Sequence, residues 1–216
     1  EKITSKASDK ISQLNNDQDA KQRVIQSFHP FPVLLIGLGG TGTKALLDLR
    51  RRMLVKYDDV SRRHMDYLSI DTVGFGEDKS IHEGQGRPSF SAESRLQIKN
   101  VDAHSCSQIL RQYPSFSEWL SPGVLEAEKR TASFGSKPSR LLSRLSFFSN
   151  YSTISSRIES KLYRLKKEYN GRDKTKVFVV AGLGDRTGSG MFLDIAAVVK
   201  NLIGSIGDIE LTLLLV

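Results

Sequence analysis

The sequence predicts an α/β fold with a doubly wound, mostly parallel sheet and helices on both faces. Residues 33–36 and 177–180 are continuous apolar runs, which are typical of strands buried on both faces. Each run is followed by a glycine-rich turn and then by apolar residues at helical spacing. Because strands that alternate with helices pair in parallel through crossover connections, these two units indicate a single parallel sheet.

The other elements are justified in chain order. Residues 1–30 are polar with only a weak helical stripe, so they are expected to form an N-terminal extension to a domain over residues 31–216. That domain is expected to be incomplete at its C-terminal end, since the chain stops inside an apolar run. In the first half of the domain, a strand is expected at 67–70, a loop over 74–88, a third strand within 89–134 and a helical fragment at 102–113. In the second half, one long helix or two are expected over 140–169 and a helix over 191–203, which Gly204 and Gly207 would end. A last strand is expected at 209–216.

Composition excludes several classes of protein. Among the 216 residues, 38% are hydrophobic and 26% are charged, values typical of a globular protein. The longest apolar stretch, 191–199, is interrupted by Asp194 and is far shorter than the roughly 20 residues that cross a bilayer. Cys106 is the only cysteine, which excludes an internal disulfide and favours a cytoplasmic location, and no metal site is expected.

The net charge of +8 raises the question of nucleic-acid binding. The basic residues are spread through several segments and are not interleaved with aromatic residues. Solvated helix faces on a protein that handles an anionic ligand therefore explain the charge better than a dedicated nucleic-acid surface does.

The first glycine-rich turn fits the pattern G-x-G-x-x-G. Such a turn between a strand and a helix suits phosphate binding, because bare backbone lets amide groups approach closely and the helix N-terminus carries partial positive charge. On its own the pattern is also compatible with a simple tight turn. The candidate binding residues in this loop are Gly37, Gly39, Gly40, Thr41 and Gly42.

The second glycine-rich turn strengthens the phosphate interpretation. It has four glycines within nine residues and two hydroxyl side chains, which is more than a simple turn requires. With a strand order of 3-2-1-4-5, the first and fourth strands are neighbours and both loops open onto one crevice, which would suit several linked phosphates. The candidate residues here are Gly184, Asp185, Arg186, Thr187, Gly188, Ser189 and Gly190.

These two loops resemble the glycine loops of the tubulin/FtsZ family, over about residues 32–216. The second loop is the more specific match, since Gly184-Asp185-Arg186-Thr187-Gly188-Ser189-Gly190 stands where the family has G-G-G-T-G-[ST]-G. The pair Asp71 and Thr72 after the second strand also resembles a loop of the family, and 135–144 lies where a third phosphate loop and its helix are expected.

The resemblance implies a Rossmann-like domain that binds GTP, with Mg²⁺ as a candidate companion ion. The first loop would contact the distal phosphates, and Thr187 to Gly190 would hold the α and β phosphates. It also implies head-to-tail self-association into cytoskeletal filaments, in which an acidic loop from the next subunit completes the GTPase site. That loop would follow the nucleotide-binding half, so the residues present here would not hydrolyse GTP alone.

Asp185 and Arg186 depart from the family pattern, which has glycines there. An unpaired carboxylate about 4 Å from a phosphate charge costs on the order of 4 kcal/mol at an effective dielectric constant of about 20. The Asp185 carboxylate would therefore have to point away, hold Mg²⁺ against the phosphates, or be neutralised by Arg186. The sequence leaves these three alternatives open.

Other polar residues have two interpretations each. Arg140 and Arg144 lie on one helix face and, with Lys137 and Ser139, would clamp a terminal phosphate or simply be exposed basic residues. Asp71 would contact a ribose or cap a turn. Asp194, one turn into an apolar helix, would satisfy backbone amides at the helix start.

Two other functions compete with GTP binding. One is an NAD(P)-dependent oxidoreductase that uses the first glycine loop, although this leaves the second loop unexplained and places Asp71 farther along the chain than usual. The other is a non-hydrolysing tubulin-like interaction module, in which Asp185 and Arg186 mark an altered nucleotide site.

Overall fold

The fold is described by a computed structural model that covers residues 31–56, 64–73, 90–101, 103–121, 123–124, 126, 139–169 and 174–216. The N-terminal extension expected at residues 1–30, the loop expected over 74–88, and Lys137 lie outside these described residues.

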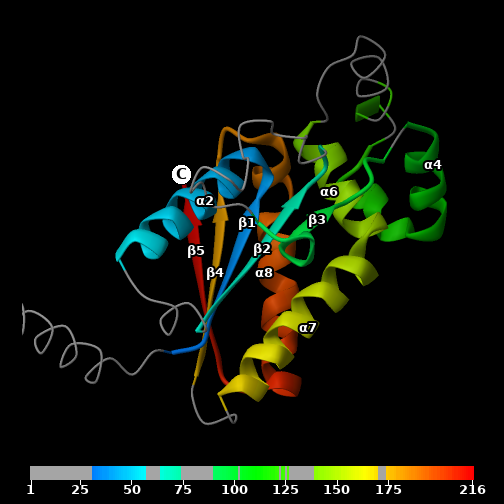
Figure 1. Ribbon diagram of the computed structural model, residues 1–216. Coiled ribbons are helices and arrows are strands. Elements are labelled where there is room, and N and C mark those ends of the chain that lie inside the picture. The colour runs from blue at the N-terminus through cyan, green and yellow to red at the C-terminus, as the bar shows by residue number, and fades with distance from the viewer. Residues whose placement is uncertain are drawn as a thin grey trace, which may run out of the picture. The chain divides into compact units, whose positions relative to one another are not determined.

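The described residues form five parallel strands in the order β3-β2-β1-β4-β5, which confirms the predicted sheet (Figure 1). The third strand, β3, falls within the stretch where it was expected. In chain order the elements are β1 (Val33–Leu38), α2 (Gly39–Lys56), β2 (Met65–Asp71), η2 (Ala92–Ser94), β3 (Arg95–Gln97), α4 (Ala103–Gln112), η3 (Pro114–Glu118), α6 (Arg140–Ser149), α7 (Tyr151–Glu168), β4 (Thr175–Ala181), α8 (Arg186–Ile206) and β5 (Ile209–Leu215).

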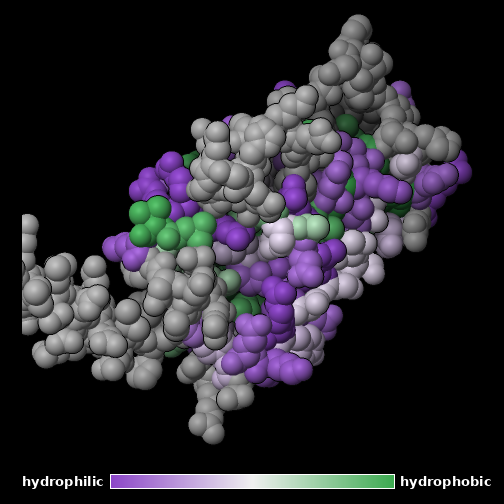
Figure 2. All heavy atoms as spheres, in the orientation of Figure 1, coloured by the Kyte–Doolittle hydropathy of each residue, from purple (hydrophilic) through white to green (hydrophobic). Residues whose placement is uncertain are grey.

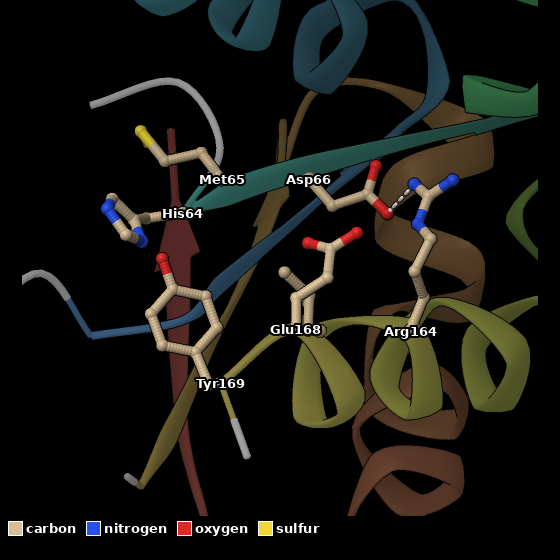
Figure 3. Close-up of a pocket in the computed structure, with 7 residues that line it drawn as sticks. His64, Met65, Asp66, Arg164, Glu168 and Tyr169 are labelled. Atoms are coloured by element: carbon tan, nitrogen blue, oxygen red, sulfur yellow. Dashed lines mark hydrogen bonds and ion pairs between the residues drawn. The ribbon is translucent and has the colours of Figure 1, made fainter. Parts of the chain in front are cut away.

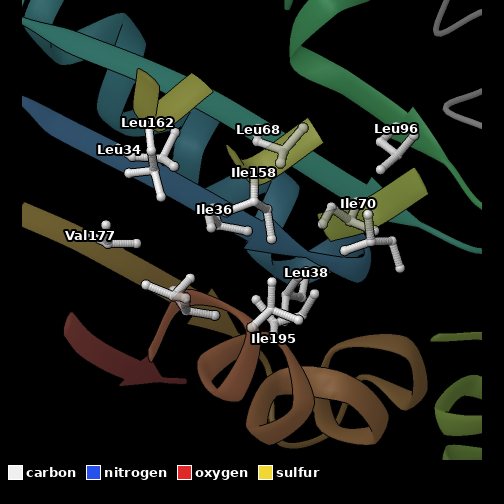
Figure 4. Close-up of a cluster of buried hydrophobic side chains, with 14 of the residues drawn as sticks. Leu34, Ile36, Leu38, Leu68, Ile70, Leu96, Ile158, Leu162, Val177 and Ile195 are labelled. Carbon is white, nitrogen blue, oxygen red and sulfur yellow. The ribbon is translucent and has the colours of Figure 1, made fainter. Parts of the chain in front are cut away.

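Helices cover both faces of the sheet, as predicted. Successive side chains of a strand point to opposite faces, so β1 divides its apolar residues between two layers. Leu35 packs with Leu46 of α2 on one face, whereas Leu34, Ile36 and Leu38 join the main core on the other. In Figure 4 these three leucine and isoleucine side chains lie among residues of α7 and α8, including Ile158, Leu162 and Ile195. The continuous apolar run of β1 is thus explained by burial on both faces.

Helix boundaries agree with the sequence expectations in one place and differ from them in two. The segment expected as one long helix or two is two helices, α6 and α7, joined at Asn150. Helix α8 begins at Arg186 and not at Met191, so most of the second glycine motif lies in its first turn. Gly204 lies inside α8, and only Gly207 ends it, with a φ of 129° that favours glycine.

By length and composition alone, α8 is long and apolar enough to cross a membrane. Core helices of soluble proteins share these properties. Met191, Ile195 and Val199 of α8 are buried in the main core against the sheet, so its apolar character has a packing explanation. Figure 2 shows a viewer-facing surface that is mainly hydrophilic over α7, with separate hydrophobic spots elsewhere.

Candidate functional site: two helix N-termini that share one carboxylate

The first glycine loop turns directly from β1 into α2. Gly37 is the fifth residue of the strand and Gly39 is the first of the helix, so the motif spans the strand–helix junction. Gly39 has a φ of 67°, which explains why glycine is needed at the turn. Gly40 and Thr41 are exposed at the N-terminus of α2.

The second glycine loop begins α8 with Asp185 as its N-cap. Asp185 has an extended backbone (φ −82°, ψ 127°), and its Oδ1 accepts a hydrogen bond of 3.0 Å from the Thr187 amide. Aspartate is one of the preferred N-cap residues because it satisfies an otherwise unpaired amide. Asp185 therefore caps a helix at a position where the tubulin/FtsZ pattern has glycine.

The same carboxylate joins the two loops. Its other oxygen, Oδ2, accepts a hydrogen bond of 3.1 Å from the Thr41 amide in the first turn of α2. In the free protein the Asp185 side chain therefore points into the gap between the two loops. Amide groups from two helix N-termini thus converge on one anion, an arrangement that helix dipoles favour.

The hydroxyl groups of the motif are used inside the fold. Thr72 and Thr187 are both buried, and their hydroxyl oxygens lie 2.9 Å apart in a hydrogen bond. Ser189 donates its hydroxyl to the Asp185 carbonyl, 2.5 Å away. These side chains tie the end of β2 and the first turn of α8 together. The gap between the N-termini of α2 and α8, which the Asp185 side chain spans, is called the pocket below.

A second hydroxyl pair supports the first loop and was not identified from the sequence. Thr43 donates its hydroxyl to the Gly39 carbonyl at 2.7 Å, and its oxygen lies 2.5 Å from the Ser69 hydroxyl. This contact holds the start of α2 against β2. No local pattern could reveal it, since the two residues lie on different elements that only the sheet brings together.

Asp71 lies at the end of β2 beside the pocket. Its Oδ1 accepts a hydrogen bond of 3.2 Å from the Val73 amide, as expected of a residue that caps a turn. Burial raises the pKa of Asp71 above its ordinary value, amide hydrogen bonds oppose this, and the nearby Asp185 carboxylate adds to the rise. The two carboxylates therefore place negative charge on one side of the pocket.

The two candidate arginines of α6 have different partners. Arg140 donates to the Leu183 carbonyl at 2.7 Å, so it lies across the second glycine loop. Arg144 pairs with Asp194 of α8 at 3.0 Å and lies 4.5 Å from the centre of the Trp119 ring. Arg144 and Asp194 thus form an ion pair between α6 and α8.

The glycines of the two motifs fall into two groups. Some are needed because a neighbouring backbone lies too close for a Cβ atom: at Gly188 a Cβ would lie 2.9 Å from the Leu38 carbonyl oxygen, and at Gly190 it would lie 2.6 Å from that of Arg140. At Gly40 and Gly184 a Cβ would meet nothing within 4 Å. Packing explains the first group, whereas Gly40 and Gly184, which directly precede Thr41 and Asp185 in the chain, border open space.

A hollow of about 470 Å³ lies at the opposite end of the sheet (Figure 3). In this hollow, buried Asp66 pairs with Lys161 at 2.8 Å and also with Arg164. The rings of His64 and Tyr169 lie 4.8 Å apart in a tilted arrangement, and the Tyr169 hydroxyl is buried without a hydrogen-bond partner among the described residues. Burial lowers the pKa of Lys161, and the bond to Asp66 opposes this. The arrangement anchors α7 to β2 and offers no converging amide groups.

Within the part of the chain that the structure describes, no group of three or more His, Cys, Asp or Glu side chains could hold a metal ion. The side chains of His104 and Cys106 lie outside that description.

Comparison with known proteins gives one match. A family model described as tubulin like matches residues 34–216, which is most of the chain and includes both glycine loops. Searches of curated proteins and of solved structures returned no match. The strand order, the two loops at the switch point and the family match agree, and the chain belongs to the tubulin-like family.

Proposed function

We propose that this protein binds GTP, with the phosphates at the pocket between the two glycine loops, and that the complete protein assembles into nucleotide-dependent filaments in the cytoplasm. The observation that carries the proposal is a pair of hydrogen bonds: the backbone amides of Thr41 and Thr187 donate to the two carboxylate oxygens of Asp185. A pocket that satisfies a carboxylate in this way has the charge and the donors to accept phosphate oxygens.

The positions of the loops support several linked phosphates as the ligand. They follow β1 and β4, which are neighbours at the point where the strand order reverses. Two helix N-termini at one place supply about +0.5 elementary charge each and two separate sets of amide donors, which suits linked phosphates better than a single helix N-terminus does. The oxidoreductase alternative uses only the first loop and gives no role to the start of α8.

Hydrolysis is proposed only for the assembled protein. An acidic loop from a neighbouring subunit would supply the catalytic group, and Mg²⁺ would neutralise part of the phosphate charge. The amides of Thr41 and Thr187 would bind and orient the phosphates at this pocket.

Glycine-to-alanine variants test the site. In the full-length protein, Gly40→Ala and Gly184→Ala should fold normally, because their new methyl groups meet nothing within 4 Å in the free protein. Both methyl groups would crowd the ligand, so calorimetric titration should show GTP binding weakened about tenfold or more, the equivalent of about 1.4 kcal/mol.

The matched control is Gly204→Ala, which also meets no atom within 4 Å but lies near the far end of α8. It should leave GTP affinity unchanged.

Wild-type protein should bind GTP with micromolar or tighter affinity and sediment as polymer only with GTP. Absence of GTP binding at millimolar concentration would remove the proposal and leave the interaction-module alternative, and tighter binding of NADH would favour the oxidoreductase.

A further inference from the structure

Asp185 occupies the place where the pocket would hold an anion. Its two carboxylate oxygens accept from the Thr41 and Thr187 amides at 3.1 and 3.0 Å, both within the normal range for such bonds. These amides belong to the first turns of α2 and α8, where no intrahelical acceptor is available. A phosphate oxygen that approaches either amide must therefore replace the carboxylate.

The first loop is shaped to receive this carboxylate. A Cβ atom on Gly39 would collide with the side chain of Asp185, and the φ of 67° at Gly39 also favours glycine. The Asp185 side chain is half-buried, with one bond to its own helix and one that reaches a residue 144 positions away. The two hydrogen bonds thus fix the Asp185 side chain in a specific contact between the two loops.

The two bonds of Asp185 have separable roles. The bond to Thr187 caps α8, a role that serine also fulfils. The bond to Thr41 crosses to α2 and contributes nothing to the cap. Since like charges repel, the carboxylate and a phosphate cannot share these amides.

From these contacts we infer that Asp185 is an internal competitor for the phosphate pocket, which closes the gap between the two loops in the free protein and rotates out when a polyphosphate binds. The inference rests on the proposed function, because it concerns the same pocket. Asp185 then sets the affinity: if the pocket is open in about a tenth of the molecules, the apparent dissociation constant is about tenfold higher than that of the open pocket.

Asp185→Ser separates competition from capping. Serine keeps an N-cap hydroxyl for the Thr187 amide but is too short to reach the Thr41 amide. We expect the full-length variant to bind GTP and pyrophosphate about tenfold more tightly than wild type in calorimetric titrations. Asp185→Gly should behave in the same way, with only a small loss of helix stability.

The matched control is Asp208→Asn, which removes one negative charge at an exposed position after α8, outside the pocket. It should leave both affinities unchanged. Amide hydrogen exchange gives a second readout without any ligand: in Asp185→Ser the Thr41 amide should exchange faster than in wild type, whereas the Thr187 amide should stay protected. A variant that had merely lost its helix cap would expose Thr187 first.

The outcomes separate this inference from the proposed function. If wild type binds GTP and Asp185→Ser binds it equally or more weakly, the competitor role is overturned and GTP binding stands. If wild type binds no GTP but Asp185→Ser does, the competitor role is supported and the proposed function of the natural protein is overturned. Binding by neither protein overturns both.

Discussion

At the residue scale, the carboxyl group of Asp71 has a raised pKa because it is partly buried, with the Asp185 carboxylate as an added cause. An acid whose pKa is higher in the folded than in the unfolded protein binds a proton more readily when folded. Its contribution to stability therefore falls as pH rises from the unfolded pKa, about 3.9, through the folded pKa, and remains low at neutral pH.

Asp71→Asn should accordingly stabilise the protein at pH 7. Asparagine keeps the Oδ1 acceptor for the Val73 amide and removes the charge. We expect a rise in Tm of about 1 to 2 °C, corresponding to roughly 0.5 kcal/mol, since partial exposure to water limits the effect. Thermal melts followed by circular dichroism should show the difference at pH 7 and lose it near pH 3. An unchanged Tm at pH 7 would show that the carboxyl group is not strained by its surroundings.

Sequence reasoning identified Asp185 as the residue that intrudes on the pocket, but not where its side chain goes. The direction depends on the Thr41 amide, which is distant in sequence and comes into range only when β1 and β4 pair. The same limit applies to Arg144. Its spacing from Arg140 predicted a shared helix face, but its partner, Asp194, lies on another helix.

At the element scale, Gly190 is expected to serve helix packing. A Cβ at this position of α8 would lie 2.6 Å from the Arg140 carbonyl oxygen and 2.8 Å from the Ser143 Cβ, both on α6. Gly190→Ala should force the two helices apart and destabilise the protein by about 1 to 3 kcal/mol, the usual range for an overpacked interior.

Urea unfolding would measure this effect, with Gly204→Ala as the control on the same helix. Because Gly204 has open space around it, alanine there should leave stability unchanged or raise it by about 0.4 to 1 kcal/mol. If both variants unfolded at the same urea concentration, the close approach of α6 and α8 would not be the reason for glycine at position 190.

Long apolar elements were predictable and short ones were not. Strands β1 and β4 and helix α8 have continuous or strongly periodic apolar residues, so their existence follows from the pattern alone. Strand β3 has only three residues and one buried side chain, Leu96, which is too little for a periodicity. The position of the break at Asn150 is also hard to predict. The side-chain amide of Asn150 donates hydrogen bonds to the Ser146 carbonyl of α6 and to the Lys99 carbonyl, and Lys99 is distant in the sequence.

At the scale of the whole molecule, the strand order followed from a topological rule. Two strand–loop–helix units in one parallel sheet place their loops together only if the first and fourth strands are neighbours, and the observed order has this property. The rule predicts which loops meet. It does not predict that a side chain fills the space between them, since that depends on distances of a few ångströms.

The free edge of the sheet leads to a last prediction. Strand β5 pairs with β4 along one side, and no strand lies on its other side among the described residues. Leu213, Leu214 and Leu215 are 36%, 45% and 45% exposed, so three consecutive apolar residues are open to solvent at this edge. An exposed apolar edge strand offers unpaired backbone groups to another chain, and a lysine at such an edge opposes that pairing.

We therefore expect the 216-residue chain to self-associate through β5, and Leu215→Lys to shift it toward the monomer in sedimentation velocity at micromolar concentration. Val55→Lys, at an 86% exposed position on α2, adds the same charge away from the edge and should leave the association unchanged. Addition of GTP should not alter the effect of Leu215→Lys, because edge pairing uses backbone groups of β5 and not the phosphate pocket. If both lysine variants dissociated the chain equally, net charge and not the strand edge would control its association.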